Sequence, residues 1–280
     1  MRDQRTITRL SITTLFILIT IYLLVSVRTN LQTVRNDVTI AVNSATPKFV
    51  ELDVAVVGDI HVADNSHSLL LLSELIEEVI SADPDLVLFV GDYTESPSAV
   101  GEMTRHRQTI IDAFVQTKPI PSVFVLGNYE TWSDADLWYS EMSRSGLNVL
   151  ENEVQIFETR KGPVCVRGLG DRYSGRFRYV DYPATCDDIA KLSVTHDPSG
   201  AFHDRVKGLV FAGHTHCGQV KLPLVGIIWV PSDAPDHGVC GLHEDKRRSV
   251  FVTSGVGTSI LPVRFGAQSQ WDFIEVQIGY

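Results

Sequence analysis

The sequence predicts an α/β fold built on a mostly parallel sheet, and two observations carry this prediction. Three apolar runs have the length and β-rich composition of buried strands, at residues 52–57, 85–90 and 122–127. Between them, residues 66–82 and 104–117 place apolar side chains at helical spacing. Strands that alternate with helices form right-handed β-α-β units, and their strands lie parallel.

The first 50 residues precede this pattern, and they predict a membrane anchor. Residues 10–27 are apolar and uncharged, close to the roughly 20 residues that span a bilayer core. A cleavable signal peptide is the alternative, but no Ala-x-Ala-like site follows the apolar run. Residues 1–9 form a short basic tail, which favours a single-pass cell-membrane protein with its globular part outside the cytoplasm. Residues 28–50 are expected to form a juxtamembrane linker.

Residues 51–280 are expected to form one globular domain. Five further strands are predicted in this domain, with few long helices between them, so a second sheet is expected. These strands are residues 164–169, 192–195, 208–213, 250–254 and 271–278. With 44% apolar and 21% charged residues, the chain is neither disordered nor collagen-like. Its net charge of −10 argues against a nucleic-acid partner, and it repels phosphate esters unless cations reverse the local field.

Four cysteines occur in the chain, at Cys165, Cys186, Cys217 and Cys240. They show no C-x-x-C spacing, which argues against a zinc site made of cysteines. In an exported domain Cys165 can pair with Cys186, or Cys217 with Cys240, but the sequence leaves all three connectivities open. Cys217 is expected to be a small packed residue rather than a metal ligand.

Polar side chains follow the ends of five predicted strands, as in Gly58-Asp59-Ile60-His61 and Gly91-Asp92. Because ligands of α/β sheets bind outside the carboxyl ends of the strands, these side chains should converge. The candidate metal ligands are Asp59, His61, Asp92, Asn128, His196, His214 and His216. A single such Asp is often only a helix cap, but five strand ends of this kind indicate two divalent ions, either Mn, Fe, Zn or Mg.

The motifs GDIH, GDY, GNYE, THDP and GHTHCGQ resemble, in this order, those of the calcineurin-like metallophosphoesterases. The match is to a membrane-associated branch that includes bacterial cell-envelope phosphodiesterases and a UDP-2,3-diacylglucosamine pyrophosphatase. It runs from about residue 52 to 266 and includes GVGTSILPVRFG. The resemblance implies a four-layer sandwich, with two facing β-sheets flanked by helices and the metals at one sheet edge.

The resemblance also implies how the ligands divide between the two metals, with Asp92 as the bridge. One metal takes Asp59, His61 and His216, and the other takes Asn128, His196 and His214. A hydroxide held between the metals would attack phosphorus, and the metals would bind the phosphoryl oxygens.

One position departs from the family pattern. The third motif usually reads Gly-Asn-His-Asp or Gly-Asn-His-Glu, and its histidine assists the leaving group or the phosphoryl oxygens, but here Tyr129 takes its place. A phenol is a far weaker acid than an imidazolium, although it still donates a hydrogen bond. We expect metal binding to survive and the substrate preference to move toward activated phosphodiesters or pyrophosphates. Glu130 is expected either to orient a neighbouring group or to act as a helix-start carboxylate.

Three arginines cluster with aromatic residues in GDRYSGRFRY, at Arg172, Arg176 and Arg178. These arginines either bind a phosphate group or form a solvated basic loop. Asp197, directly after His196, is expected to support that ligand rather than to bind metal.

Together these features predict a membrane-anchored phosphoesterase with two metals, which hydrolyses a phosphodiester or pyrophosphate bond. Lipid-linked molecules and components of the cell envelope are the candidate substrates. The predicted catalytic residues are Asp92, Asn128, Tyr129 and Glu130. The alternative is a metal-binding regulatory module with weak or no turnover because of Tyr129, and a phosphomonoesterase is a second rival.

Overall fold

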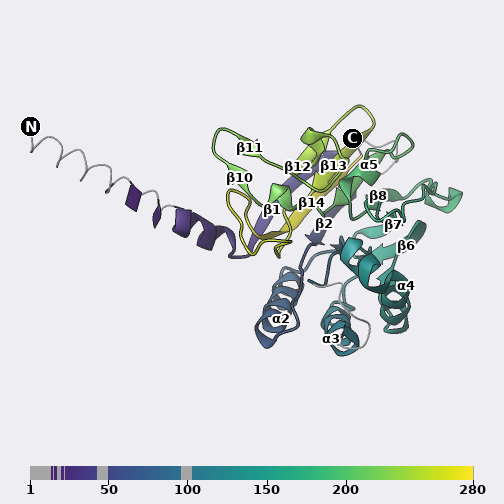
Figure 1. The fold of residues 1–280 in the computed structure, drawn as a ribbon. Coiled ribbons are helices and arrows are strands. Elements are labelled where there is room, and N and C mark those ends of the chain that lie inside the picture. Colours follow the sequence, from purple (N-terminus) through teal and green to yellow (C-terminus); the bar gives the residue numbers. More distant parts are fainter. Residues whose placement is uncertain are drawn as a thin grey trace, which may run out of the picture.

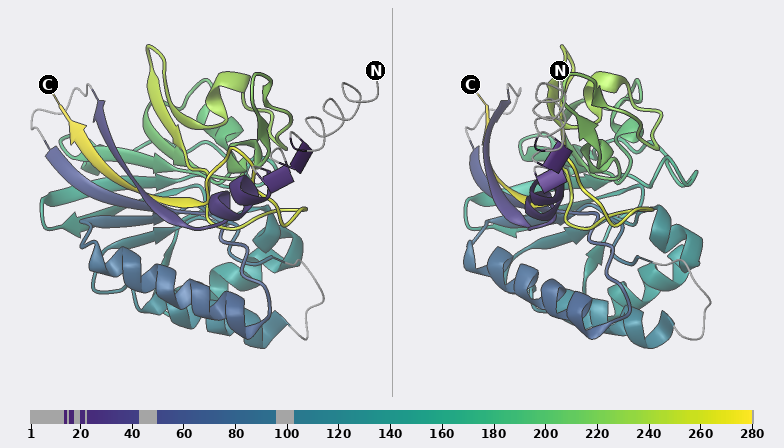
Figure 2. Two further views of the ribbon diagram at one scale, coloured as in Figure 1. Left: turned by 90° about the vertical axis from the view of Figure 1, so that its left-hand side faces the viewer. Right: turned by 60° about the vertical axis from the view of Figure 1, so that its left-hand side comes forward.

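The computed structural model describes residues 14, 16, 17, 20, 21, 23–42, 50–95 and 103–279, which fold around two facing sheets (Figures 1 and 2). The first sheet has the strand order β1-β14-β2-β3-β4-β5. Its strands are β1 (Val34–Val42), β14 (Gln270–Ile278), β2 (Val50–Val57), β3 (Leu86–Phe89), β4 (Ser122–Phe124) and β5 (Asn148–Val149). Strands β2 to β5 pair in parallel, as the β-α-β pattern predicts.

The second sheet has the order β12-β13-β9-β8-β7-β6, and its four inner strands are parallel. Its strands are β6 (Glu153–Thr159), β7 (Gly162–Gly168), β8 (Ala190–Val194), β9 (Gly208–Ala212), β12 (Gly241–Glu244) and β13 (Arg248–Val252). A separate hairpin joins β10 (Lys221–Leu222) to β11 (Gly226–Ile227). All predicted strands are present, although the third ends at Phe124 rather than at residue 127.

Side chains of alternate strand residues divide the core into layers. In β2, Val54 and Val56 point between the two sheets, whereas Ala55 and Val57 pack under the helices. The helices on that outer face are α2 (Ser66–Ser81), α3 (Met103–Val115) and α4 (Asn128–Arg144) (Figure 1). Helices α2 and α3 were predicted within two residues at each end. The free face of the second sheet is covered by the short helix α5 (Pro198–Ala201) and by loops.

The expected linker of residues 28–50 is wrong for residues 34–42, which form β1. This strand pairs with β14 along its whole length, and Ile40 is buried between the sheets with Val38 and Val42 packed beside it. The apolar residues at every second position give the strand a buried face, which a linker lacks.

Of the predicted membrane span, residues 10–27, the structure describes residues 14, 16, 17, 20, 21 and 23–27. The rest of the span and the basic tail of residues 1–9 lie outside the described residues. Within the part of the chain that the structure describes, none of the helices has the length and apolar character required to cross a bilayer.

Candidate metal centre

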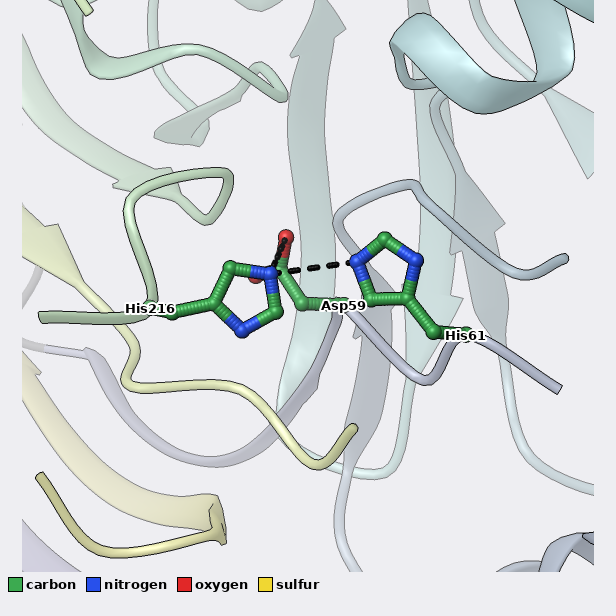
Figure 3. Close-up of side chains that lie close together, drawn as sticks. All are labelled: Asp59, His61 and His216. Carbon is green, nitrogen blue, oxygen red and sulfur yellow. Dashed lines mark hydrogen bonds and ion pairs between the residues drawn. The ribbon is translucent and has the colours of Figure 1, made fainter. Parts of the chain in front are cut away.

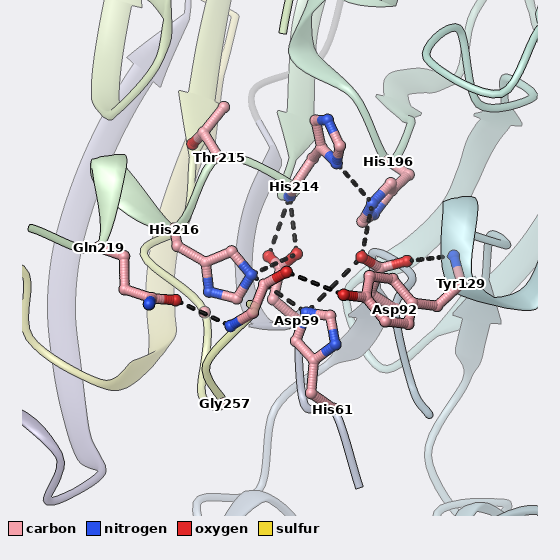
Figure 4. A network of polar contacts seen from close by, with 12 residues as sticks. Asp59, His61, Asp92, Tyr129, His196, His214, Thr215, His216, Gln219 and Gly257 are labelled. Atoms are coloured by element: carbon pink, nitrogen blue, oxygen red, sulfur yellow. Dashed lines mark hydrogen bonds and ion pairs between the residues drawn. The ribbon is translucent and has the colours of Figure 1, made fainter. Parts of the chain in front are cut away.

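All seven predicted ligands lie beyond the carboxyl ends of strands, and Figure 4 shows six of them, all except Asn128, close together. The first sheet supplies its ligands after β2, β3 and β4, and the second supplies the rest after β8 and β9. Every one of these side chains is buried. The structure therefore brings together the residues that the sequence motifs single out.

The first ligand group consists of Asp59, His61 and His216, whose ligand atoms lie within 4.8 Å of one another (Figure 3). Nε2 of His61 is 3.1 Å from Nε2 of His216. The same His216 nitrogen is 3.7 Å from Oδ1 of Asp59. Three potential ligand atoms thus surround one point.

The second ligand group consists of Asp92, His196 and His214, and Asn128 joins it. Oδ1 of Asn128 is 3.1 Å from Nε2 of His196. Oδ2 of Asp92 lies 3.3 Å from this nitrogen and 3.6 Å from Nε2 of His61 in the first group. Asp92 therefore stands between the groups, where a bridging carboxylate is required.

Backbone carbonyls fix the orientation of two imidazoles. Nδ1 of His196 is 2.7 Å from the carbonyl oxygen of Val90, and Nε2 of His214 is 2.5 Å from that of Pro231. A carbonyl only accepts, so each of these nitrogens donates its N–H. The remaining nitrogens, Nε2 of His196 and Nδ1 of His214, face each other at 3.1 Å. Such outer partners are typical of metal-binding histidines, and the donor set fits a divalent cation.

Burial and mutual charge shift the pKa values of the carboxylates and of His196. Burial, together with repulsion from Asp92, raises the pKa of Asp59 to about 7. Burial also opposes ionisation of Asp92, but His196 and its neighbours outweigh it and lower the pKa of Asp92 to about 2. In return, Asp92 outweighs burial and holds the pKa of His196 well above its usual range. A proton on His196 thus balances the Asp92 carboxylate, and a bound divalent cation would supply this positive charge in its place.

The ligands share an unusual backbone conformation. Five of them have a left-handed φ between 49° and 69°, namely Asp59, His61, Asp92, His214 and His216. Residues other than glycine rarely adopt this region, and such conformations concentrate at functional sites.

Glycines beside the ligands leave room for ligands from neighbouring strands. A Cβ on Gly127 would lie 2.2 Å from Oδ1 of Asp92. A Cβ on Gly213 would lie 2.6 Å from Oδ2 of Asp59. These close approaches explain the glycines at positions 127 and 213, where any side chain would collide with a ligand from the neighbouring strand.

Glu130 holds the loop that carries Asp92. Its carboxylate accepts hydrogen bonds from the backbone N–H groups of Asp92, Tyr93, Thr94 and Gly127, at 2.7 to 3.3 Å. Burial, with repulsion from Asp92, raises the pKa of Glu130 to about 7, and the backbone N–H groups oppose this rise. Of its two predicted roles, the structure places Glu130 in the positioning one, although it also lies in the first turn of α4.

Tyr129 contacts the centre in two ways. Its backbone N–H donates to Oδ1 of Asp92 at 2.9 Å. Its ring lies edge-on to His61, with ring centroids 4.6 Å apart, and its hydroxyl is 3.0 Å from the hydroxyl of Ser259. The contact with Asp92 comes from the backbone, so it is the same for histidine or tyrosine at this position.

Sequence reasoning missed Arg264, which is fully buried beside His216. One guanidinium nitrogen lies 3.0 Å from Nδ1 of His216 and also donates to backbone carbonyls of Ser254, Gly255 and Gly257. This nitrogen carries two hydrogens, and three carbonyl oxygens already compete for them. The contact with Nδ1 therefore keeps the imidazole beside Arg264 but does not define the tautomer of His216. The signal for this role was present, since an arginine in the otherwise uncharged run GVGTSILPVRFG needs buried acceptors.

The cysteines form two disulfides, Cys165–Cys186 and Cys217–Cys240. Cys217 is therefore buried and paired, as expected of a packed residue. It follows His216 in the short helix η2 (His216–Gly218), so its disulfide ties this ligand loop to the segment that ends at Cys240.

Asp197 is not in either ligand group. It caps α5 by accepting the N–H of Ser199, and the hydroxyl of Ser232 donates to it at 2.5 Å. Because Pro231 accepts from His214, Asp197 steadies the segment that orients this ligand.

A cavity of about 480 Å³ opens onto the metal centre. Asp92, Asn128, His214 and His216 form its polar floor. The remaining walls are largely aromatic and aliphatic, including Tyr129, Trp132, Tyr173, Ile228, Trp229, Ile260 and Leu261.

The arginine cluster stands apart from this cavity. Arg176 pairs with Glu151 at 2.5 Å and with Asp136 at 2.9 Å. Arg172 and Arg178 are exposed, and neither lines the cavity. Of the aromatic residues in the same loop, Tyr173 does line it, with its ring 4.6 Å from that of His214.

Comparison with known proteins places this centre in a family. The profile of the calcineurin-like phosphoesterases matches residues 52–218. The metallophosphoesterase YkuE of Bacillus subtilis is 27% identical over 225 residues, which cover 76% of this chain and 74% of that protein. The phosphodiesterase YaeI of Escherichia coli is 26% identical over 212 residues, which cover 74% of this chain and 75% of that protein. The crystal structure of the calcineurin-like phosphoesterase YfkN from Bacillus subtilis aligns with a TM-score of 0.43 at 14% identity, and the match covers 79% of this chain and 89% of that one.

The fold and the two ligand groups define a metal-dependent phosphoric ester hydrolase. The chain belongs to the calcineurin-like phosphoesterase family, whose members use divalent metal ions.

Proposed function

We propose that this protein is a membrane-anchored phosphoesterase that hydrolyses a phosphodiester or pyrophosphate bond in a lipid-linked or cell-envelope substrate. The observation that carries the proposal is the cavity. Its floor holds residues of both ligand groups, including the bridging Asp92, while its walls are mostly apolar. A phosphoryl group fits the floor, and the walls suit a substrate with an extended apolar part.

The two ligand groups would each hold one divalent ion, with Asp92 shared between them. When bound, such ions lower the pKa of water and neutralise charge on phosphoryl oxygens. The protein's own part is to hold the ligands in place before the substrate arrives. His196 and His214 are oriented by carbonyls, Asp92 by the N–H of Tyr129, and the loop of Asp92 by Glu130.

Tyr129 determines which leaving groups are accepted in this proposal. Its hydroxyl lines the cavity beside Ser259 and can donate a hydrogen bond, but a phenol is a far weaker general acid than the imidazolium of the usual histidine. Leaving groups that need little protonation, such as the phosphate of a pyrophosphate or an activated alcohol, are therefore favoured. An unactivated phosphomonoester is disfavoured.

We also propose that the domain faces the extracytoplasmic side, tethered by residues 10–27. Two disulfides support this location, because they persist in oxidising compartments. The charge bias around the apolar stretch agrees with the same orientation.

Hydrolysis by the purified full-length chain with Mn²⁺ tests the proposal. We expect faster turnover of bis(4-nitrophenyl) phosphate than of 4-nitrophenyl phosphate, and no turnover of either by Asp92→Ala. Tyr129→His should speed the cleavage of esters with poor leaving groups selectively. Metal binding without turnover of any diester would instead support the regulatory module, and a preference for the monoester would support a phosphomonoesterase.

A further inference from the structure

Two segments beside the cavity expose apolar side chains. Each of these residues has more than half of its surface exposed: Leu224, Val225, Ile228, Trp229, Ile260 and Leu261, here called the apolar rim. Residues 217–232 contain one charged residue, Lys221, and residues 255–263 contain none. A contiguous exposed apolar surface of this kind marks an interaction site.

The apolar rim connects the cavity to the N-terminal helical residues. Trp229 and Ile260 line the metal cavity, whereas Leu224 and Val225 line a second hollow together with Ser26. The chain just after Ser26 is fixed here, because the side chain of Gln268 donates to the carbonyl of Thr29 at 3.1 Å. Figures 1 and 2 show β10, β11 and the N-terminal helical residues on the same side of the molecule.

The helical residues on this side are themselves apolar and exposed. Residues 16–25 read FILITIYLLV, and 70% of the surface of Phe16 and 67% of that of Leu24 is exposed. Apolar side chains are thus exposed both on these helical residues and on the apolar rim, and Ser26 lies between them in the second hollow. A lipid bilayer is a partner whose chemistry suits both sets of side chains, and tryptophan, as at position 229, is enriched where protein meets the bilayer interface.

We infer that the apolar rim enters the bilayer interface beside the N-terminal helix, so that the metal cavity opens toward the lipid headgroups. A substrate could then place its phosphoryl group over the ligands while its acyl chain remains in the bilayer. The substrate half of this inference rests on the proposed function, whereas the insertion of the apolar rim does not.

Tryptophan fluorescence tests the insertion directly, because the four tryptophans differ in environment. Trp138 and Trp271 are buried, while Trp132 is 51% and Trp229 62% exposed. The full chain is reconstituted in palmitoyl-oleoyl phosphatidylcholine vesicles, or in vesicles whose second acyl chain carries bromine at carbons 6 and 7. We expect the brominated lipid to quench the wild-type protein and Trp132→Phe, and Trp229→Phe to lose most of the quenching.

Quenching that is equal in wild type and Trp229→Phe would overturn the inference. The inference would also be overturned if brominated lipid did not quench Trp229 and its emission shifted to the blue as the protein concentration rose. A second copy of the protein would then cover the apolar rim.

A kinetic arm separates insertion from catalysis. Leu224 and Val225 do not line the metal cavity, so Leu224→Ser/Val225→Ser should hydrolyse aqueous bis(4-nitrophenyl) phosphate at the wild-type rate. With hexadecyl 4-nitrophenyl phosphate in phosphatidylcholine vesicles, we expect a rate about tenfold lower. An unchanged vesicle rate would count against the role of the apolar rim. If neither ester is hydrolysed by the wild type while Trp229 is still quenched, the proposed function fails and the insertion stands.

Discussion

The two disulfides offer a matched pair of perturbations, and only one of them touches the metal centre. Cys165–Cys186 joins β7 to η1 (Ala184–Cys186), away from the ligands. Cys217–Cys240 anchors the residue directly after His216. Thr215 adds a second tie, since its hydroxyl donates to the carbonyl of Val239 at 2.6 Å.

The loops that the two disulfides close are nearly equal in length, because the paired cysteines are separated by 21 and 23 residues in the sequence. In the chain-entropy description, closing either loop stabilises the folded state by about 3.4 kcal/mol, and the two values agree to about 0.1 kcal/mol. Replacing either pair by serines should therefore lower the free energy of unfolding by the same amount. Any difference in metal binding must then come from what each disulfide holds.

We expect Cys217→Ser/Cys240→Ser to weaken metal binding by roughly 10- to 100-fold, as changes to groups that orient a ligand do. Cys165→Ser/Cys186→Ser should leave it unchanged. Urea unfolding of the purified chain gives the stability of each variant. Metal titration gives the metal affinity of each variant, and the rate with bis(4-nitrophenyl) phosphate gives its activity. Both are measured at a temperature where both variants are folded. Equal metal affinities in the two variants would refute the reasoning.

Two further substitutions probe the positioning of Asp92. Gly127→Ala should remove bound metal, because the new Cβ would lie 2.2 Å from Oδ1 of Asp92. Gly175→Ala adds backbone strain at a φ of 77°, but nothing lies within 4 Å of its new Cβ, so this control should keep the metal; elemental analysis of purified protein decides. Glu130→Gln puts an amide N–H₂ where a carboxylate oxygen accepts two buried N–H groups, at a cost of about 1–3 kcal/mol for each. The free energy of unfolding should fall accordingly, while exposed Glu74→Gln should not change it; a drop below 1 kcal/mol for Glu130→Gln would contradict the positioning role.

The metal centre could be predicted from sequence because parallel strands place their carboxyl ends together. Asp59 and Asp92 follow adjacent strands of the first sheet, so their approach follows from the β-α-β order. His196 and His214 follow adjacent strands of the second sheet in the same way. That the two sheets face each other with these edges aligned came only from the family resemblance.

Other parts of the molecule left no such signal. Strand β1 lies at a sheet edge and carries three consecutive polar residues, Arg35, Asn36 and Asp37. Its apolar alternation is therefore confined to the short stretch Val38, Ile40 and Val42, and the segment reads as a linker until β14 is available as its partner. The cavity walls come from segments far apart in the chain, such as Trp132, Tyr173 and Ile260. None of these belongs to a motif, and only the folded chain makes them neighbours.

The contacts that hold Asp92 explain how the family's histidine can be replaced without dismantling the site. Asp92 receives the backbone N–H of Tyr129, and its own loop is held by Glu130 and by hydrogen bonds to the neighbouring strand end, including His61 N–H to the carbonyl of Asp92 at 3.1 Å. None of these contacts uses the side chain at position 129. Such backbone contacts also hold Asp59, His61 and Asp92 in left-handed conformations that cost roughly 1–2 kcal/mol each in a free chain. These main-chain contacts hold the ligands whichever side chain stands at position 129, so Tyr129 can replace the family's histidine without removing any of them.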